Sequence, residues 1–286
     1  MSEQTHAADR VWLITGASSG FGRTLAEAAL AAGDTVVAAA RRPAALDDLA
    51  AAHPQRLVPV AADVTDTARA EQVVAEAVER FGRIDVLVNN AGRGLVGAVE
   101  ETSDAELRDL MDLHFFGPAA LVRAALPHMR ARKSGAIVQM SSMGGRLSFP
   151  GVGAYSATKF ALEGLTEALA GEVAEFGIRT LIVEPGAFRT GFAGGGALRQ
   201  TAAVLPAYEG TVGGVRTGLP DSDGKQPGDP VKAAAAILAA LDAERTPLRL
   251  ALGNDALDAI LAHADAARAE ARTWESVSRG TDFDDA

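Results

Sequence analysis

Three residues with reactive side chains are spaced in the chain as a redox site would need them. Tyr155 and Lys159 lie four residues apart in YSATK, and Ser142 precedes the tyrosine by thirteen residues. If this segment is helical, positions i and i+4 share one face, so the phenol and the ammonium point into the same space. A phenol titrates near ~10, and a neighbouring cation favours the phenolate, which allows proton exchange with a substrate oxygen. The alternative is an ordinary surface pair on a helix, because YxxxK alone is a weak pattern.

A glycine-rich turn near the N-terminus could bind the phosphates of a nucleotide. The apolar run VWLIT at 11–15 leads into Gly16, Gly20 and Gly22, and a helical pattern follows. Glycines let the backbone approach a pyrophosphate, and the helix N-terminus near Gly20 offers free N–H groups with a partial positive charge. The spacing G-x-x-x-G-x-G differs from the commonest dinucleotide fingerprint. A turn that serves only helix packing is the alternative.

Short apolar runs alternate with helical patterns along the chain. This alternation predicts a single α/β domain over 10–286, with helices on both faces of a parallel sheet. Residues 1–9 are expected to form a disordered tail, and 255–276 a C-terminal helix. Strands are expected at 11–15, 35–40, 57–61, 84–89, 136–141, 179–183 and 247–251. The other helices are expected at 20–32, 66–81, 104–131, 154–177 and 230–242.

Composition excludes several classes of function. The chain has 286 residues, 48% of them hydrophobic, which is enough material for a sizeable core. It has no cysteine, which excludes disulfides, thiol nucleophiles and thiolate-bound metals, and the histidines show no metal-ligand spacing. A net charge of −10 disfavours nucleic acids and anionic membranes as partners. Since no signal peptide or membrane span is evident, we expect a cytoplasmic protein without a metal site.

Five motifs occur in a characteristic order: TGASSGFG at 15–22, NNAG at 89–92, Ser142, YSATK, and EPG at 184–186. Together they resemble the short-chain dehydrogenase/reductase family, in its compact single-domain branch, over about 10–255. The stretches HFFGP and EPGAFRTGF are similar to reductases of the hydroxysteroid and retinol dehydrogenase type. The resemblance implies a Rossmann-type, doubly wound fold with a seven-stranded parallel sheet. It also implies hydride transfer between a nicotinamide cofactor and a carbonyl or secondary alcohol.

The resemblance assigns roles to the catalytic candidates. Lys159 would hold the nicotinamide ribose and lower the pKa of Tyr155, the general acid, while Ser142 would hydrogen-bond the substrate oxygen. Strand alternation and the thirteen-residue gap favour Ser142 over Ser141. His114 stands where the family usually has an asparagine whose backbone carbonyl serves a proton path. The imidazole could join that path and alter the pH response, or it could be a buried structural histidine.

Cofactor preference is predicted from the end of the second strand. An acidic residue there would bind the ribose 2′-hydroxyl of NAD, but the position is Ala40. Arg41 and Arg42 follow and suit the 2′-phosphate of NADP, so NADP(H) is favoured and NAD(H) is possible. Arg42 could instead be a solvated charge, and Asp63, which matches an adenine contact, could cap a helix. The resemblance implies further cofactor contacts at Gly16, Ser18, Ser19, Gly20, Phe21, Gly22, Val64, Asn90, Ala91, Gly92, Tyr155, Lys159, Pro185, Gly186, Phe188 and Thr190.

The substrate is expected to be a largely apolar small molecule with a carbonyl or hydroxyl group. In the family, the segment corresponding to 187–228 covers the substrate, and here it is Gly-rich, weakly periodic and expected to be mobile without ligand. Relatives pair the helices corresponding to 104–131 and 154–177, which implies a homodimer or homotetramer. Further apolar pocket walls are expected at Leu95, Val96, Phe149 and Val152.

Three functions remain open on the sequence alone. The leading one is an NADP(H)-dependent carbonyl reductase. The second is an NAD-preferring hydroxysteroid-type dehydrogenase that works in oxidation. The third is a catalytically silent cofactor-binding regulator, against which the intact Ser142, Tyr155 and Lys159 argue, although a fold by itself never proves a function.

Overall fold

Runs of aliphatic residues form the strands of a central parallel sheet in the computed structural model, which describes residues 9–194 and 196–283. Strands β1 and β2 are buried along their whole length, because helices cover both faces of the sheet. The sheet order is β3-β2-β1-β4-β6-β7-β9, and every pair is parallel. The seven-stranded, doubly wound fold is therefore confirmed. The strands are β1 (Val11–Thr15), β2 (Thr35–Ala40), β3 (Leu57–Ala61), β4 (Val86–Asn89), β6 (Gly135–Met140), β7 (Ile178–Pro185) and β9 (Arg249–Leu252).

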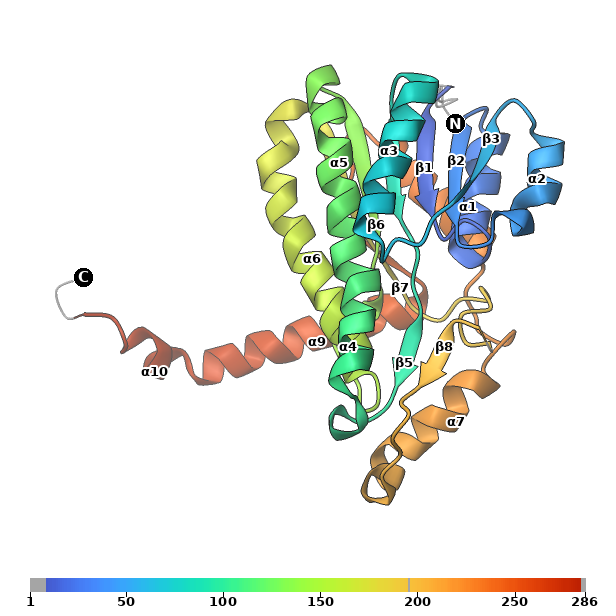
Figure 1. The fold of residues 1–286 in the computed structure, drawn as a ribbon. Coiled ribbons are helices and arrows are strands. Elements are labelled where there is room, and N and C mark those ends of the chain that lie inside the picture. Colours follow the sequence, from blue (N-terminus) through green and yellow to red (C-terminus); the bar gives the residue numbers. More distant parts are fainter. Residues whose placement is uncertain (1–8, 195, 284–286) are drawn as a thin grey trace.

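Two layers of helices enclose the sheet (Figure 1). Apolar side chains of α1 and α8 form one core with one face of the sheet, and those of α3, α5 and α6 form a second core with the other face. The order of strands reverses between β1 and β4, so a crevice opens at their carboxyl ends, where such folds bind ligands. These helices are α1 (Gly20–Ala31), α3 (Thr67–Phe81), α5 (Gly117–Arg132), α6 (Gly153–Val173) and α8 (Pro230–Asp242).

The helix expected over 104–131 is present, but its α-helical hydrogen-bonding pattern is interrupted by a π-helical turn that was not predicted. It consists of α4 (Asp104–Met111), a π-helical turn at Asp112–Phe116 and α5. Gly117 follows the turn, and a side chain at this position would lie 2.4 Å from the carbonyl oxygen of Val64. Single π turns inside α-helices are frequently found at functional sites. Here the turn contains His114.

The segment 187–228 is more regular than predicted. Its strand β8 (Leu198–Gln200) pairs in parallel with β5 (Gly94–Val96), and a helix, α7 (Gly214–Asp221), follows. Figure 1 shows β5, β8 and α7 beyond the carboxyl ends of the main sheet. A three-residue strand paired with a distant partner leaves no periodic signal in the sequence, which explains why it was missed. The mobility of the segment stays a prediction.

The C-terminal part extends away from the sheet as α9 (Asn254–Thr273) and α10 (Glu275–Arg279) (Figure 1). Together they correspond to the helix predicted at 255–276. The short helix α2 (Asp47–Ala52) was not predicted. The tail predicted at 1–9 lies outside the described residues except for Asp9. Among the described residues, no helix has the length and apolar character needed to cross a bilayer.

Candidate active site

A cavity of about 1090 Å³ opens at the carboxyl ends of the central strands. It brings together residues from the N-terminal turn, the middle of the chain and the segment after β7. Every residue predicted to contact cofactor or substrate oxygen lines it, with the exception of Gly22. The lining includes Gly16, Ser18, Ser19, Gly20, Phe21, Arg41, Arg42, Asp63, Val64, Asn90, Ala91, Gly92, His114, Ser142, Tyr155, Lys159, Pro185, Gly186, Phe188 and Thr190.

The glycine-rich turn fits a phosphate-bearing group. Gly16 and Gly20 have φ angles of 63° and 52°, in the left-handed region that favours glycine. Helix α1 begins at Gly20, and the side chain of Ser19 does not cap it, so the first N–H groups of the helix remain available to an anion. A side chain at Gly22 would lie 2.4 Å from the Gly16 carbonyl oxygen. Gly22 therefore serves the packing of the helix against the turn.

Asn90 fixes the turn to the end of β4. Its amide Nδ2 donates to the carbonyl oxygens of Thr15 at 2.9 Å and Gly16 at 3.3 Å. The Thr15 hydroxyl in turn accepts from the backbone N–H groups of Asn90 and Ala91. Asn89 is buried and donates to the Pro118 carbonyl oxygen at 3.4 Å, which agrees with its assignment to structure. The NNAG motif thus holds the two halves of the crevice together.

Arg41 and Arg42 directly follow β2, and both are exposed residues that line the cavity. Neither arginine forms a salt bridge with another residue in the described part of the chain, so both guanidinium groups are available to a phosphate. Asp63 accepts from the backbone N–H and the hydroxyl of Thr65 at 3.0 and 2.8 Å. Burial opposes ionisation of Asp63, but the Thr65 donors and the charge of Arg41 bring its pKa below its ordinary value. The cap of α3 is Asp66, so the helix-cap interpretation of Asp63 is wrong.

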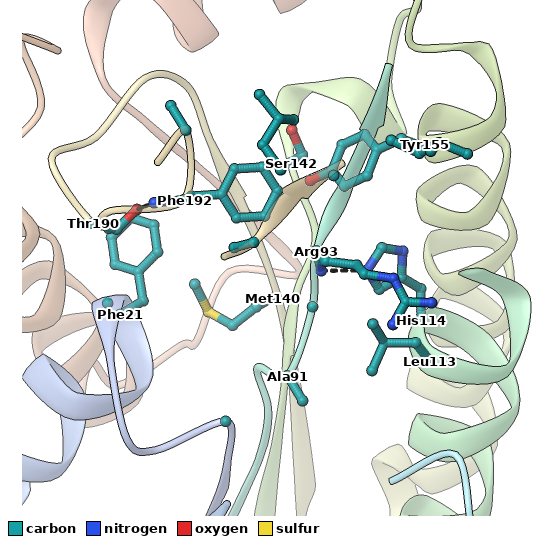
Figure 2. Close-up of a pocket in the computed structure, with 18 of the residues that line it drawn as sticks. Phe21, Ala91, Arg93, Leu113, His114, Met140, Ser142, Tyr155, Thr190 and Phe192 are labelled. Carbon is teal, nitrogen blue, oxygen red and sulfur yellow. Dashed lines mark hydrogen bonds between the residues drawn. The ribbon is translucent and has the colours of Figure 1, made fainter. Parts of the chain in front are cut away.

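Ser142, Tyr155 and Lys159 converge at the other end of the cavity. Figure 2 shows the Ser142 hydroxyl beside the Tyr155 phenol, with the Phe192 ring facing them. The Lys159 ammonium lies 5.7 Å from the centre of the Tyr155 ring and donates to the Met140 carbonyl oxygen at 2.8 Å. Both serines line the cavity, but it is the Ser142 hydroxyl that forms a hydrogen bond with the Tyr155 phenol, whereas the Ser141 hydroxyl donates to the buried carboxylate of Glu163. The choice of Ser142 over Ser141 therefore agrees with the geometry.

The expected lowering of the Tyr155 pKa by Lys159 is wrong. Burial raises the pKa of Tyr155 to about 12, opposed only by a hydrogen bond with Ser142. Burial also lowers the pKa of Lys159 to about 8, partly opposed by the charge of Glu163. The physical reason is that the phenol and the ammonium both lose hydration, which disfavours the charged form of each. Near neutral pH the site therefore holds a protonated phenol beside an ammonium.

His114 is a buried side chain with both ring nitrogens hydrogen-bonded. Nε2 accepts from the Arg93 N–H at 3.1 Å, the contact drawn in Figure 2, so Nδ1 carries the proton. Nδ1 lies 2.8 Å from the Thr158 hydroxyl, which donates to the Tyr155 carbonyl oxygen at 2.7 Å. Its ring also meets the Tyr155 ring edge-on, with 5.6 Å between centres. Burial holds the pKa of His114 well below 6.5, so it stays neutral. This geometry favours the structural interpretation.

Apolar side chains surround the space next to the phenol. The Phe192 ring lies 6.1 Å from the Tyr155 ring, and Leu95, Phe149 and Val152 line the cavity as predicted. Val96 does not, because it is fully buried in a small core with Ala98 and Val212. Several lining residues were not predicted individually, although the segment 187–228 as a whole was expected to cover the substrate. They are Phe192 from the loop before β8, Leu198 and Arg199 from β8, Val215 and Leu219 from α7, and Arg93, Asp109 and Leu113 from earlier in the chain.

Comparisons with known proteins identify the family of this chain. A sequence model of the short chain dehydrogenase family matches residues 10–198. The chain is 40% identical to the oxidoreductase BOA17 of Botryotinia fuckeliana, over 94% of this chain and 98% of that protein.

Two crystal structures are similar along nearly the whole chain. A short-chain dehydrogenase from Streptomyces avermitilis is 61% identical with a TM-score of 0.92, covering 96% of this chain and 100% of that one. A short chain dehydrogenase/reductase from Burkholderia phymatum, solved with NAD, is 29% identical with a TM-score of 0.79, covering 91% and 93%. The chain belongs to the short-chain dehydrogenase/reductase family, and it is an NAD(P)-dependent oxidoreductase of the type that interconverts hydroxyl and carbonyl groups.

Proposed function

We propose that the protein reduces the carbonyl group of a largely apolar ketone or aldehyde, with NADPH as the preferred reductant. The observation that carries the proposal is one cavity with a hydroxyl, a phenol and an ammonium at its apolar end. At its other end it has a glycine-rich turn and two arginines that form no salt bridge within residues 9–194 and 196–283. Such a cavity fits a dinucleotide along its length and a small molecule against the phenol.

The residues present fit a nicotinamide dinucleotide. Its pyrophosphate suits the open N–H groups where α1 begins, and its adenine suits the pocket beside Asp63. Lys159 would hold the nicotinamide ribose hydroxyls, and Pro185 and Gly186 would border the nicotinamide ring; all three line the cavity. Thr190 can hydrogen-bond its carboxamide. When bound, the reduced cofactor supplies a hydride to the carbonyl carbon.

The protein's own groups position and protonate the substrate. The Ser142 hydroxyl donates a hydrogen bond to the carbonyl oxygen and polarises it. Tyr155, whose phenol is protonated at neutral pH, donates its proton to the same oxygen as negative charge develops there. The Lys159 ammonium stabilises the phenolate that remains. Phe192 and the other apolar walls exclude water from this end of the cavity.

The preference for NADPH is supported by Ala40, Arg41 and Arg42. At Ala40 no carboxylate is available for the ribose 2′-hydroxyl, and the two guanidinium groups beyond it suit a 2′-phosphate. The second candidate, an NAD-preferring dehydrogenase that works in oxidation, is favoured by one observation: the Burkholderia phymatum relative was solved with NAD.

Substrate class and cofactor are tested together. A panel of ketones and aldehydes of graded size and polarity is assayed with NADPH and with NADH by loss of nicotinamide absorbance, and the corresponding alcohols with NADP⁺ and NAD⁺ by its gain. We expect apolar ketones to be reduced and kcat/KM to be higher with NADPH. Activity only with alcohols and NAD⁺ would support the second candidate, and no turnover in either direction would support a catalytically silent regulator.

Arg41→Ala tests the phosphate contact. Loss of a charge-assisted contact should weaken NADPH by about tenfold or more and leave NADH within about twofold. Fluorescence titration of both reduced cofactors measures the two dissociation constants, with Arg245→Ala, a surface arginine outside the cavity, as the matched control. An equal loss for both cofactors would mean that the 2′-phosphate is held elsewhere.

We further propose that the enzyme is a homodimer or homotetramer formed through the helices that carry the site. Phe116, at the end of the π-helical turn, and Phe160 and Leu165, on α6, are between 37% and 49% exposed. Large apolar side chains exposed on neighbouring helices are typical of a protein–protein contact. Light scattering on the eluting protein gives the mass, and a monomer at micromolar concentration would contradict this proposal.

A further inference from the structure

A buried group of charged side chains lies behind Ser142 and Lys159, outside the cavity. Its centre is Glu163, which follows Lys159 by one turn of α6 and is only 2% exposed. One carboxylate oxygen accepts from the Ser141 hydroxyl, and the other accepts from the Arg249 guanidinium on β9. Glu163 therefore joins the catalytic helix to the strand end that carries Ser142.

The group continues to the turn that borders the nicotinamide site. Arg249 also donates to the Glu184 carboxylate at 2.9 Å, and Arg146 donates to the same oxygen at 3.3 Å. Glu184 is 2% exposed and directly precedes Pro185 and Gly186. The cluster thus consists of the buried residues Ser141, Glu163 and Glu184 and of two partly exposed arginines, Arg249 and Arg146. It connects the ends of β6 and β7 with α6 and β9.

The cluster is packed too tightly for its members to move independently. A side chain at Gly145 would lie 2.0 Å from Glu163 Oε1 and 2.5 Å from Ser141 Oγ. The Ser141 backbone N–H donates to the Val183 carbonyl oxygen at 2.8 Å, which fixes the peptide next to Ser142. A shift of the Glu163 carboxylate would therefore move Ser142 as well.

Glu163 also acts on the charge of Lys159. The Lys159 side chain is buried, and it donates a hydrogen bond to the Met140 carbonyl oxygen, which carries no full charge. Burial lowers the pKa of Lys159, and the Glu163 carboxylate is the group that opposes this effect. The other groups near the ammonium, Tyr155 and His114, are both uncharged near neutral pH.

The pKa of Glu163 is itself affected by neighbouring groups of both charges. Burial raises its pKa and the charge of Glu184 adds to this, whereas the Ser141 hydrogen bond and Arg249 favour the carboxylate. Glu167, on the next turn of α6, contacts the same guanidinium at 2.9 Å, but its side chain is 64% exposed. It offers a matched carboxylate outside the buried part of the cluster.

We propose that Glu163 is a positioning residue for the reduction, which fixes Ser142 through Ser141 and keeps the Lys159 ammonium charged at neutral pH. The kinetic part of this inference rests on the proposed function, because it assumes that the protein reduces a carbonyl group. Its electrostatic effect on Lys159 can be measured without turnover. Nothing in it requires Glu163 to contact substrate or cofactor.

The effect of Glu163 on the charge of Lys159 is tested by NMR titration of protein labelled with ¹³C at the lysine ε-carbon. The sequence contains only three other lysines, Lys133, Lys225 and Lys232. The Lys159 signal is assigned as the one that shifts in Tyr155→Phe, because the substituted ring lies next to Lys159. Loss of one nearby buried charge in Glu163→Gln should lower the Lys159 midpoint by about one pH unit or more. Glu167→Gln should leave it unchanged. An unmoved Lys159 midpoint in Glu163→Gln overturns the proposal.

Kinetics test the positioning. In Glu163→Gln, kcat for carbonyl reduction should fall by about tenfold or more at pH 8, with little change in KM for the carbonyl, and the alkaline limb of the pH profile should move with the Lys159 midpoint. Glu167→Gln should stay within about twofold of wild type. Glu163→Asp should recover part of the Lys159 shift. A kcat within twofold of wild type in Glu163→Gln also overturns the proposal.

Two further results keep the test decisive. If Glu163→Gln does not fold, Ser141→Ala removes the same hydrogen bond by a smaller change, and an unchanged kcat in that variant overturns the positioning role. If the wild-type protein reduces no carbonyl compound, the proposed function fails. The Lys159 titration then decides alone whether Glu163 controls the ammonium.

Discussion

At the scale of single residues, burial shifts the pKa values of the acid, Tyr155, and the cation, Lys159, in opposite directions. Tyr155 keeps its proton because burial raises its pKa to about 12. Lys159 holds its proton only below a pKa of about 8, because burial disfavours its charged form. A protonated phenol near neutral pH suits a proton donor in carbonyl reduction more than a base in alcohol oxidation.

These two values predict how reduction depends on pH. Lys159 has a depressed pKa, so its ammonium is present below about pH 8 and is lost as the pH rises through that value. The phenol remains protonated over the whole of this range. We expect kcat/KM for reduction to be level below pH 8 and to fall above it, as measured by initial rates with a fixed ketone. A rate that continues to rise above pH 9 would contradict this assignment of charges.

At the scale of elements, the π-helical turn at Asp112–Phe116 and the small β5–β8 sheet complete the site. The turn places the His114 ring between the Arg93 backbone and Thr158, so the ring fixes the first turn of the catalytic helix. The 3-10 turn Val99–Glu101, which follows β5, is connected to α7 by a buried ion pair between Glu101 and Arg216. Glu101 also accepts from the Leu205 N–H at 2.7 Å, so it anchors the covering segment at two points.

His114→Asn tests whether the ring is structural. Asparagine preserves the backbone carbonyl and is the residue usual in the family, so kcat should stay within about tenfold of wild type. The shorter side chain loses ring contacts and hydrogen bonds, which should cost about 1–3 kcal/mol of unfolding free energy. Urea unfolding and initial rates measure the two effects. A loss of kcat beyond a hundredfold in a stable variant would give the imidazole a direct role in proton transfer.

Arg216→Leu tests the anchoring of the covering segment. Loss of the guanidinium leaves the buried Glu101 carboxylate without its cation, which strongly disfavours the local packing. We expect faster proteolysis within 187–228 and a higher KM for the carbonyl substrate, with NADPH affinity nearly unchanged. Arg279→Leu, which removes an exposed pair with Glu275, is the control. Unchanged proteolysis and KM would show that the segment does not depend on this ion pair.

At the scale of the whole molecule, the sequence was sufficient for the features that depend on local patterns. The seven strands fall within two residues of their predicted positions, because buried parallel strands give uninterrupted apolar runs. The glycine turn, Ser142, Tyr155 and Lys159 could be identified because their spacing is local. What escaped prediction depends on distant contacts: β8 pairing with β5, the Glu101–Arg216 pair and the effect of burial on the phenol.

The account as a whole requires that one phenol, held in this cavity, protonates the substrate during carbonyl reduction. The most direct measurement is the rate of ketone reduction by Tyr155→Phe, together with its NADPH dissociation constant. We predict a loss of kcat of about a thousandfold or more, because the proton donor is absent, while NADPH binds within about threefold of wild type. A variant that reduces the ketone at a rate comparable to wild type would contradict the central claim.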